Sequence, residues 1–250
     1  MRGSVLNMFS LEQATPLTKS ERTRAHLREI ALRSFRERGY DATTIRLIAQ
    51  EAGVSVGTTH YHFAGKSQLV QELYLDVQEK HRAAASSRLD GTRDLIARLR
   101  AVYETGLDEL QPYHEHASEF VSAAMAPGSD INPLADESSP ARTITEGIFT
   151  EAVAGSTHPL PDDVAAALPR ALFVAHLLLA LYWVYDPSPG QRRTRRLLDG
   201  GLRLLRSALP LARLPLVRRP IADLLSLIGD ASPAGPDRSE QGSAEPERQK

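Results

Sequence analysis

The sequence contains no cysteine among its 250 residues. Disulfide frameworks, zinc–cysteine centres, iron–sulfur clusters and thiol catalysis are therefore excluded. Aromatic residues are also scarce, at 6%, with a single tryptophan. Hydrophobic residues (42%) and charged residues (24%) nevertheless match an ordinary globular composition, which excludes collagen-like and wholly disordered chains. The composition predicts a folded protein that needs no disulfide or metal to stabilise it.

Long hydrophobic runs are few. Near the N-terminus, Val5-Leu6 and Met8-Phe9 fall short of the apolar region of a secretory signal. The longest apolar stretch, Ala171 to Tyr185, is interrupted by His176 and is shorter than the ~20 residues that a bilayer span needs. We therefore expect a buried helix there, a cytoplasmic protein and no membrane partner.

Motifs of common enzyme classes are missing as well. The sequence has no Gly-x-Ser-x-Gly elbow, no His-Glu-x-x-His helix, no P-loop and no Gly-x-Gly-x-x-Gly. We therefore predict that the protein is not an enzyme and carries no cofactor.

The net charge of −1 conceals two regions of opposite sign. Residues 19–66 hold nine basic and five acidic side chains, a net charge of +4, which suits a surface that faces phosphate. Residues 101–170 hold two basic and twelve acidic side chains, a net charge of −10, which would repel DNA. Because a charged run is often only a solvated face, this segregation needs a motif to support it.

Apolar spacing predicts helices throughout, and strand signals are scarce. The first helix should span about Ser20 to Arg38 and end at Gly39. A short second helix should follow Thr44 as N-cap and stop at Gly53. Ser55 should cap a third helix, and a long fourth helix should follow the turn at Gly65. The predicted third and fourth helices span Ser55–Phe63 and Lys66–Leu89.

Proline, glycine and serine punctuate the rest of the chain. We expect Pro169 to kink or restart the helix that contains it. The later predicted helices are Thr92–Leu110, Tyr113–Ala126, Pro140–Ala154, Asp162–Tyr185, Gly190–Leu209 and Pro215–Ile228. The predicted domains are a flexible arm (1–18), a helix-turn-helix domain (19–66), a helical effector-binding and dimerisation domain (67–228) and a disordered tail (229–250).

Two short helices joined across Gly53-Val54-Ser55 are what a helix-turn-helix requires: a glycine for the tight turn, an apolar plug and a capping serine. The residues that follow are small or hydrogen-bonding, so they can approach base edges and phosphates in a major groove. They are Gly57, Thr58, Thr59, His60 and Tyr61. The alternative is a solvated helix face.

The run from Thr43 to Thr58 (TTIRLIAQEAGVSVGT), followed by Tyr61-His62-Phe63 and Lys66, resembles the DNA-binding signature of the TetR family of regulators. The resemblance covers roughly Ser20 to Tyr74. It implies an all-α fold: a three-helix helix-turn-helix head and a helical C-terminal body that dimerises and binds a small effector. It also implies a double-stranded DNA operator as partner.

By position, the resemblance assigns phosphate contacts to Thr44 and Lys66, each at a helix start where free N–H groups favour anions. The DNA-binding residues implied are Thr44, Arg46, Ser55, Gly57, Thr58, Thr59, His60, Tyr61 and Lys66. The sequence departs from the family pattern at Leu47, where an acid often completes a capping box, and at Thr59 and His60. The base preference therefore cannot be transferred from relatives.

Sites in the body are predicted from apolar residues alone. We expect the effector near Leu99, Tyr103, Phe120 and Phe149. The stretch around residues 168–183 is apolar nearly all round, which indicates burial on several sides. We expect a homodimer interface at Leu172, Leu179, Trp183, Leu197 and Leu204, with plain core packing as the alternative.

A metal site at His114, Glu115, His116 and Glu119 is disfavoured, because His114 and His116 would point about 200° apart on one helix.

Taken with the helix-turn-helix pattern, the sequence predicts a DNA-binding transcriptional regulator, a repressor released from a palindromic operator by a small molecule. The alternative is a helix-turn-helix regulator without a small ligand, controlled by a protein partner or constitutive.

Overall fold

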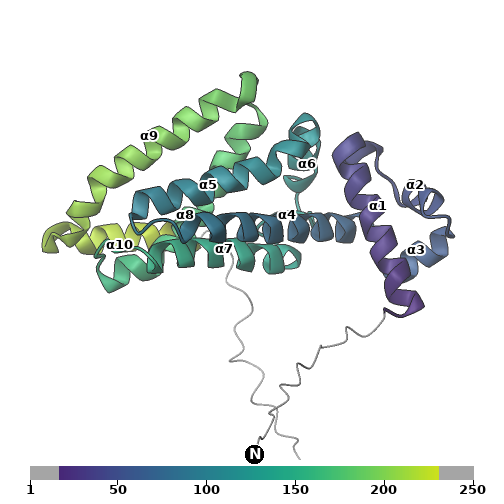
Figure 1. Ribbon diagram of the computed structural model, residues 1–250, viewed down its shortest axis with the longest axis horizontal. Coiled ribbons are helices and arrows are strands. Elements are labelled where there is room, and N and C mark those ends of the chain that lie inside the picture. The colour runs from purple at the N-terminus through teal and green to yellow at the C-terminus, as the bar shows by residue number, and fades with distance from the viewer. Residues whose placement is uncertain (1–16, 231–250) are drawn as a thin grey trace, which may run out of the picture.

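The computed structural model describes residues 17–230, and this part of the chain is helical without strands (Figure 1). We call α1–α3 the head and α5–α10 the body; α4 runs from one to the other (Figure 1). The predicted arm and tail lie outside the described residues, except for residues 17–18 and 229–230. The α helices are α1 Lys19–Ala42, α2 Ile45–Glu51, α3 Val56–His62, α4 Lys66–Leu89, α5 Leu95–Leu110, α6 Ala117–Ala124, α7 Ser139–Ala154, α8 Asp162–Val184, α9 Arg192–Ala208 and α10 Pro215–Asp230.

Side-chain caps set the helix starts in the head. Thr44 accepts a hydrogen bond from the backbone N–H of Leu47 (3.1 Å), and Ser55 accepts one from Thr58 (3.0 Å). Gly39 and Gly53 have φ of +80° and +65°, in the region that favours glycine, so each interrupts helical geometry where the sequence predicts it. The predicted starts of α2, α3 and α4 are confirmed.

The head packs on α4 through an apolar core that surface ion pairs flank. Arg24 bonds Glu72 (2.5 Å), while Arg28 contacts Glu72 (3.0 Å) and Asp76 (3.3 Å), so two residues of α1 meet two of α4. All four side chains are partly exposed. The buried core beneath them contains Leu27, Ile30, Phe35, Ile48, Phe63, Leu69 and Val70.

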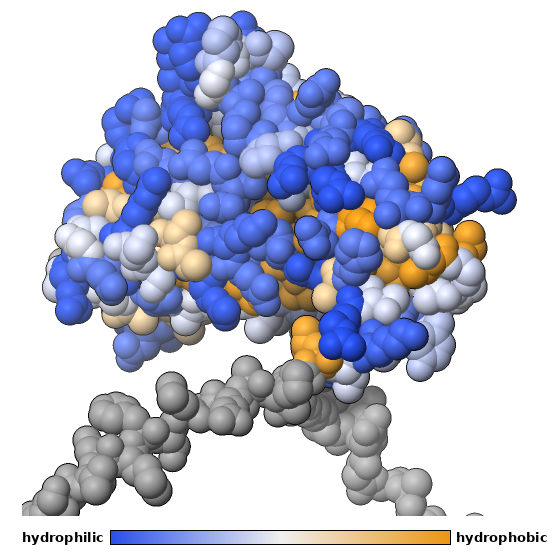
Figure 2. All heavy atoms as spheres, turned by 45° about the vertical axis from the view of Figure 1, so that its right-hand side comes forward, coloured by the Kyte–Doolittle hydropathy of each residue, from blue (hydrophilic) through white to orange (hydrophobic). Residues whose placement is uncertain are grey.

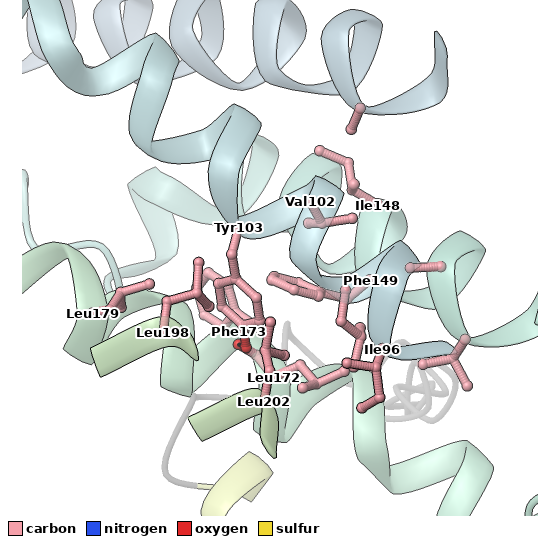
Figure 3. Packing of buried hydrophobic residues seen from close by; sticks show 14 of the residues in the cluster. Ile96, Val102, Tyr103, Ile148, Phe149, Leu172, Phe173, Leu179, Leu198 and Leu202 are labelled. Atoms are coloured by element: carbon pink, nitrogen blue, oxygen red, sulfur yellow. Dashed lines mark hydrogen bonds between the residues drawn. The ribbon is translucent and has the colours of Figure 1, made fainter. Parts of the chain in front are cut away.

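Aromatic and leucine side chains from α5, α7, α8 and α9 make the core of the body (Figure 3). Tyr103 lies 5.1 Å from Phe149 between ring centroids, and its hydroxyl donates to the carbonyl of Leu172 (3.0 Å). Phe173, Leu198 and Leu202 complete the cluster around it (Figure 3).

One arginine of α5 joins the C-terminal ends of α4 and α7. Arg98 is 5% exposed and donates to the carbonyl of Leu89, the last residue of α4, to that of Thr92 in the following loop, and to those of Glu151 and Ala152 near the end of α7. All three of its nitrogens are used. A guanidinium in this position satisfies carbonyls that helix termini leave without intrahelical partners.

The helix α8 corrects two predictions. It runs through Pro169 without a break, so the predicted restart is wrong. It is also 23 residues long and contains an 18-residue window with a mean hydropathy of 2.0, so by length and composition it could cross a membrane, and the length argument against a span fails. One such helix is weak evidence, and its side chains at His176 and Trp183 are buried within the body.

Three other predicted helices begin later than expected. The predicted helix Thr92–Leu110 starts at Leu95, because Asp94 caps it by accepting from the N–H of Ala97 (2.8 Å). The segment Tyr113–Ala126 divides into a 3₁₀ turn, Gln111–His116, and α6. The α9 helix starts at Arg192 because Gly190 (φ +62°) and Gln191 (φ +48°) leave helical geometry. The Asp186 carboxylate receives N–H and hydroxyl hydrogen bonds from Ser188 and Thr194, which fixes the turn before α9.

Candidate nucleic-acid interface and body cavity

The outer side of α3 carries exposed small and hydrogen-bonding side chains. Ser55, Gly57 and His60 are exposed, Tyr61 is 80% exposed, and Thr58 is partly so. Thr44, the N-cap of α2, and Arg46 on α2 are also exposed. The hydroxyls of Ser55 and Thr58 hydrogen-bond to each other (2.9 Å), and all of these side chains are accessible to a partner outside the head.

The assignment of Thr59 to this face is wrong. Its side chain is 0% exposed, and its hydroxyl donates to the carbonyl of Ser55 (3.3 Å). The sequence could have indicated this burial, because residues four apart share a helix face and Thr59 lies four residues before Phe63. Phe63 is also fully buried. Thr59 therefore belongs to the core of the head.

Lys66 opens α4 but is partly buried. Its ammonium nitrogen lies 3.7 Å from the ring centroid of Tyr40. Burial lowers the pKa of Lys66, and the carboxylates of Asp41 and Glu119 oppose that shift. Any phosphate that reaches this ammonium must share it with the Tyr40 ring.

A cavity of about 470 Å³ lies in the body and is lined mainly by apolar side chains. It is bounded by α4, α6, α7 and α8 and by the turns beside α6. Its wall includes Leu73, Tyr74, Val77, Gln78, Leu110, Tyr113, Phe120, Asn132, Ser138, Arg142, Phe173, His176, Leu177 and Trp183. The volume falls within the range of roughly 300–1,000 Å³ typical of small-molecule sites.

Of the four residues predicted to meet an effector, Phe120 alone lines this cavity. Leu99, Tyr103 and Phe149 are 0–4% exposed and fill the core between α5, α7 and α8 instead, so their assignment is wrong. Sequence reasoning missed the cavity because hydrophobicity does not distinguish a residue that packs against its neighbours from one that borders a void.

Phe120 also connects the cavity to the head. Its ring lies 5.6 Å from that of Phe35 and 5.5 Å from that of Tyr40, both on α1. Beside it, the Glu119 carboxylate accepts from the backbone N–H of Asp41 (2.9 Å). Gly39 has φ +80°, and a Cβ there would lie 2.4 Å from this carboxylate and 2.7 Å from Cγ of His116, so a larger residue would be strained and would displace these side chains.

The predicted dimer residues of α8 face inward. Leu172, Leu179 and Trp183 are 2–7% exposed and pack in the core, which corrects their assignment to an interface. The outer face of α8 carries Leu178, Leu181, Tyr182 and Tyr185 instead. Because α8 is apolar on both faces, the sequence alone could not separate them. On α9, Leu197 and Leu204 are 50% and 74% exposed.

Hydrophilic residues cover most of the face drawn in Figure 2, and apolar residues gather toward its middle and one side.

His114 and His116 make separate contacts: His114 meets the carbonyl of Trp183 (3.0 Å), and His116 meets Glu119 (3.0 Å). Residues 17–230 contain no group of histidine and acidic side chains that could hold a metal ion.

Two family models match the chain. Residues 27–73 match the N-terminal model of bacterial regulatory proteins of the tetR family, and residues 98–225 match a tetracyclin repressor-like C-terminal domain. The chain belongs to the TetR family. The predicted fold class, an all-α helix-turn-helix head with a helical body, is confirmed with it.

A curated TetR-family relative is the HTH-type transcriptional repressor KstR2 of Mycobacterium tuberculosis, 33% identical over 91 residues. The match covers 36% of this chain and 46% of KstR2, so the chain spans about half the length of the curated relatives it matches.

Solved structures share the fold at lower identity. A tetR-family transcriptional regulator from Streptomyces coelicolor matches with a TM-score of 0.57 and 20% identity, over 86% of this chain and 92% of that one. A regulator of the same family from Shewanella sp. PV-4 gives a TM-score of 0.50 at 22% identity, over 72% and 95% of the two chains.

Proposed function

We propose that this chain is a DNA-binding transcriptional repressor that acts in the cytoplasm as a homodimer and leaves its operator when a small molecule occupies the body cavity. The observation that carries the proposal is the exposed outer side of α3, held by two capped helices in a member of a regulator family.

In the proposed complex, contacts that position the protein differ from contacts that read bases. Thr44 and Lys66 bind phosphates, one through a hydroxyl and the other through an ammonium. Arg46, Thr58, His60 and Tyr61 face the major groove, where their donors and acceptors meet base edges. Ser55 and Gly57 are small enough to let the backbone approach the DNA.

The proposed release works through the elements that the head and the cavity share. On α4, Leu69 and Val70 lie in the core of the head, and Leu73 and Val77 belong to the same buried cluster and also line the cavity. A ligand that displaces Phe120 or α4 therefore acts on the packing of α1. For a hundredfold loss of DNA affinity, ligand affinities for the two states must differ by about 2.7 kcal/mol.

Selection of bound fragments from random duplex DNA tests the DNA-binding half of the proposal. A twofold-symmetric dimer reads a twofold-symmetric site, so we expect a palindrome whose half-site centres lie about 34 Å apart, one turn of DNA. Selection that enriches no palindrome would contradict the proposal.

The second candidate is a regulator without a small ligand, controlled by a protein partner or constitutive. The cavity favours control by a ligand. Screening small molecules by thermal shift separates the two, because a ligand that binds the folded state raises the melting temperature. A ligand that lowers operator affinity supports release.

A further inference from the structure

The cavity wall contains one charged side chain among its described residues, Arg142. It lies one turn into α7 and is 7% exposed. No aspartate or glutamate of the described chain lines the cavity. The proposed effector site is therefore an apolar chamber with a single buried cation in its wall.

The hydrogen bonds of Arg142 leave most of its donors unused. Its Nη1 donates to the carbonyls of Pro133 (3.2 Å) and Ala135 (3.1 Å). Its Nε and Nη2 make no hydrogen bond or ion pair within residues 17–230, and neither is among the fully buried polar atoms that lack a partner, so both face space that a small molecule or water can enter. Arg98, the other buried arginine of the body, uses all three of its nitrogens.

A guanidinium that is largely removed from solvent and has no counter-ion is unfavourable, since an opposite charge does not compensate for the lost hydration. The structural role of Arg98 explains its burial, because four carbonyls surround it. Arg142 bonds two carbonyls through a single nitrogen, and these two bonds do not account for the burial of its whole guanidinium group. Its free donors instead match the planar, bidentate geometry of a carboxylate.

His176 adds a polar but uncharged group to the wall. It is 4% exposed, and its Nδ1 has no hydrogen-bond partner in the described chain. Burial, and secondarily the neighbouring His81, lowers the pKa of His176 to about 3. At neutral pH the imidazole is therefore neutral, and Arg142 is the one source of positive charge in the wall.

We propose that the cavity binds an amphipathic organic monoanion, whose carboxylate pairs with Arg142 and whose hydrocarbon body fills the apolar chamber. This inference rests on the proposed function for its regulatory meaning, but the binding itself is independent of DNA. The single cation selects one negative charge, and the surrounding leucine, phenylalanine and tryptophan side chains select an apolar body.

Three probes with the same ten-carbon chain test the charge preference: decanoate, 1-decanol and decyltrimethylammonium, each titrated below its micelle concentration and followed by calorimetry. We expect decanoate to bind about ten times more tightly than decanol, because its head makes a charge-assisted hydrogen bond, and the cation to bind most weakly. Arg142→Met should remove the advantage of decanoate and leave decanol binding nearly unchanged.

Two further variants serve as controls. Arg142→Lys keeps the charge without the planar fork and should retain part of the preference. Arg93→Met removes an exposed arginine outside the cavity and should retain all of it. If Arg142→Met loses its helical circular dichroism, the Arg142→Lys variant and the three probes on the unaltered protein decide the question.

Equal binding of decanoate and decanol to the unaltered protein would overturn the inference, as would a preference that persists in folded Arg142→Met. DNA selection on the same preparation keeps the two proposals apart. A protein that prefers decanoate but enriches no palindrome contradicts the proposed repressor alone. A protein that enriches a palindrome but prefers decanol contradicts the monoanion alone.

Discussion

The head and the body place their polar contacts differently. In the head, the ion pairs of Arg24 and Arg28 with α4 lie at the surface around a small apolar core. In the body, Arg98 is buried among four carbonyls, and Arg142 is buried beside a cavity. Surface pairs contribute little to stability, whereas buried charges are costly to disturb. Substitutions of these surface pairs in the head should therefore change stability little, whereas substitution of a buried arginine such as Arg98 should change it strongly.

The largest expected effect comes from two leucines of α9. Leu202 is 3% exposed in the core, and Leu204 is 74% exposed on the face proposed for the dimer. A charge at 202 cannot be solvated, so Leu202→Asp should lower the free energy of unfolding by more than about 4 kcal/mol. Leu204→Asp should leave folding intact within about 0.5 kcal/mol and weaken the dimer.

Urea unfolding and sedimentation measure these two outcomes separately. If Leu202→Asp unfolds at the same urea concentration as the unaltered protein, the result would contradict the place of Leu202 in the core of the body. A dimer that survives Leu204→Asp would move the interface away from this part of α9.

Two arginines of α5 give the next effect. Arg98→Met leaves the carbonyls of Leu89, Thr92, Glu151 and Ala152 without that donor, and should lower the free energy of unfolding by about 3 kcal/mol. Arg100 pairs with Asp199 and Glu104 while 38% exposed, so Arg100→Met should change it by less than about 1 kcal/mol. Similar urea midpoints for the two variants would show that burial does not decide the outcome.

The same contrast explains which features the sequence predicts. Thr44, Gly53 and Ser55 act through contacts a few residues away, so the starts of α2 and α3 follow from local rules. Which face of α8 is buried depends on the helices packed against it, among them α7, α9 and α10, and a stretch that is apolar nearly all round carries no pattern that separates Leu178 from Leu179. The sequence pattern does not predict the cavity either, because the cavity depends on how whole helices pack against one another.

In the head, neighbouring threonines of α3 should act on different properties. Thr58 is partly exposed on the outer side, so Thr58→Ala should change the preferred base at one operator position by about 1–3 kcal/mol. Thr59 is fully buried, so Thr59→Val should leave base preference unchanged and alter stability by about 1 kcal/mol. Selection from random DNA with each variant checks this, and a changed consensus for Thr59→Val would contradict its place in the core.

The smallest effect is expected at Lys66, which should position the head without reading bases. Replacing it with alanine removes one phosphate contact, so the slope of log affinity against log salt should fall by about 0.9 and affinity should drop equally for all sequences. Since the ammonium already lies against the Tyr40 ring, the loss of affinity should be smaller than for a fully exposed lysine. Lys80→Ala provides the control, because Lys80 lies further along α4 and pairs with Asp76 (2.6 Å). A change of base preference in Lys66→Ala, with an unchanged salt slope, would instead assign the residue to the groove.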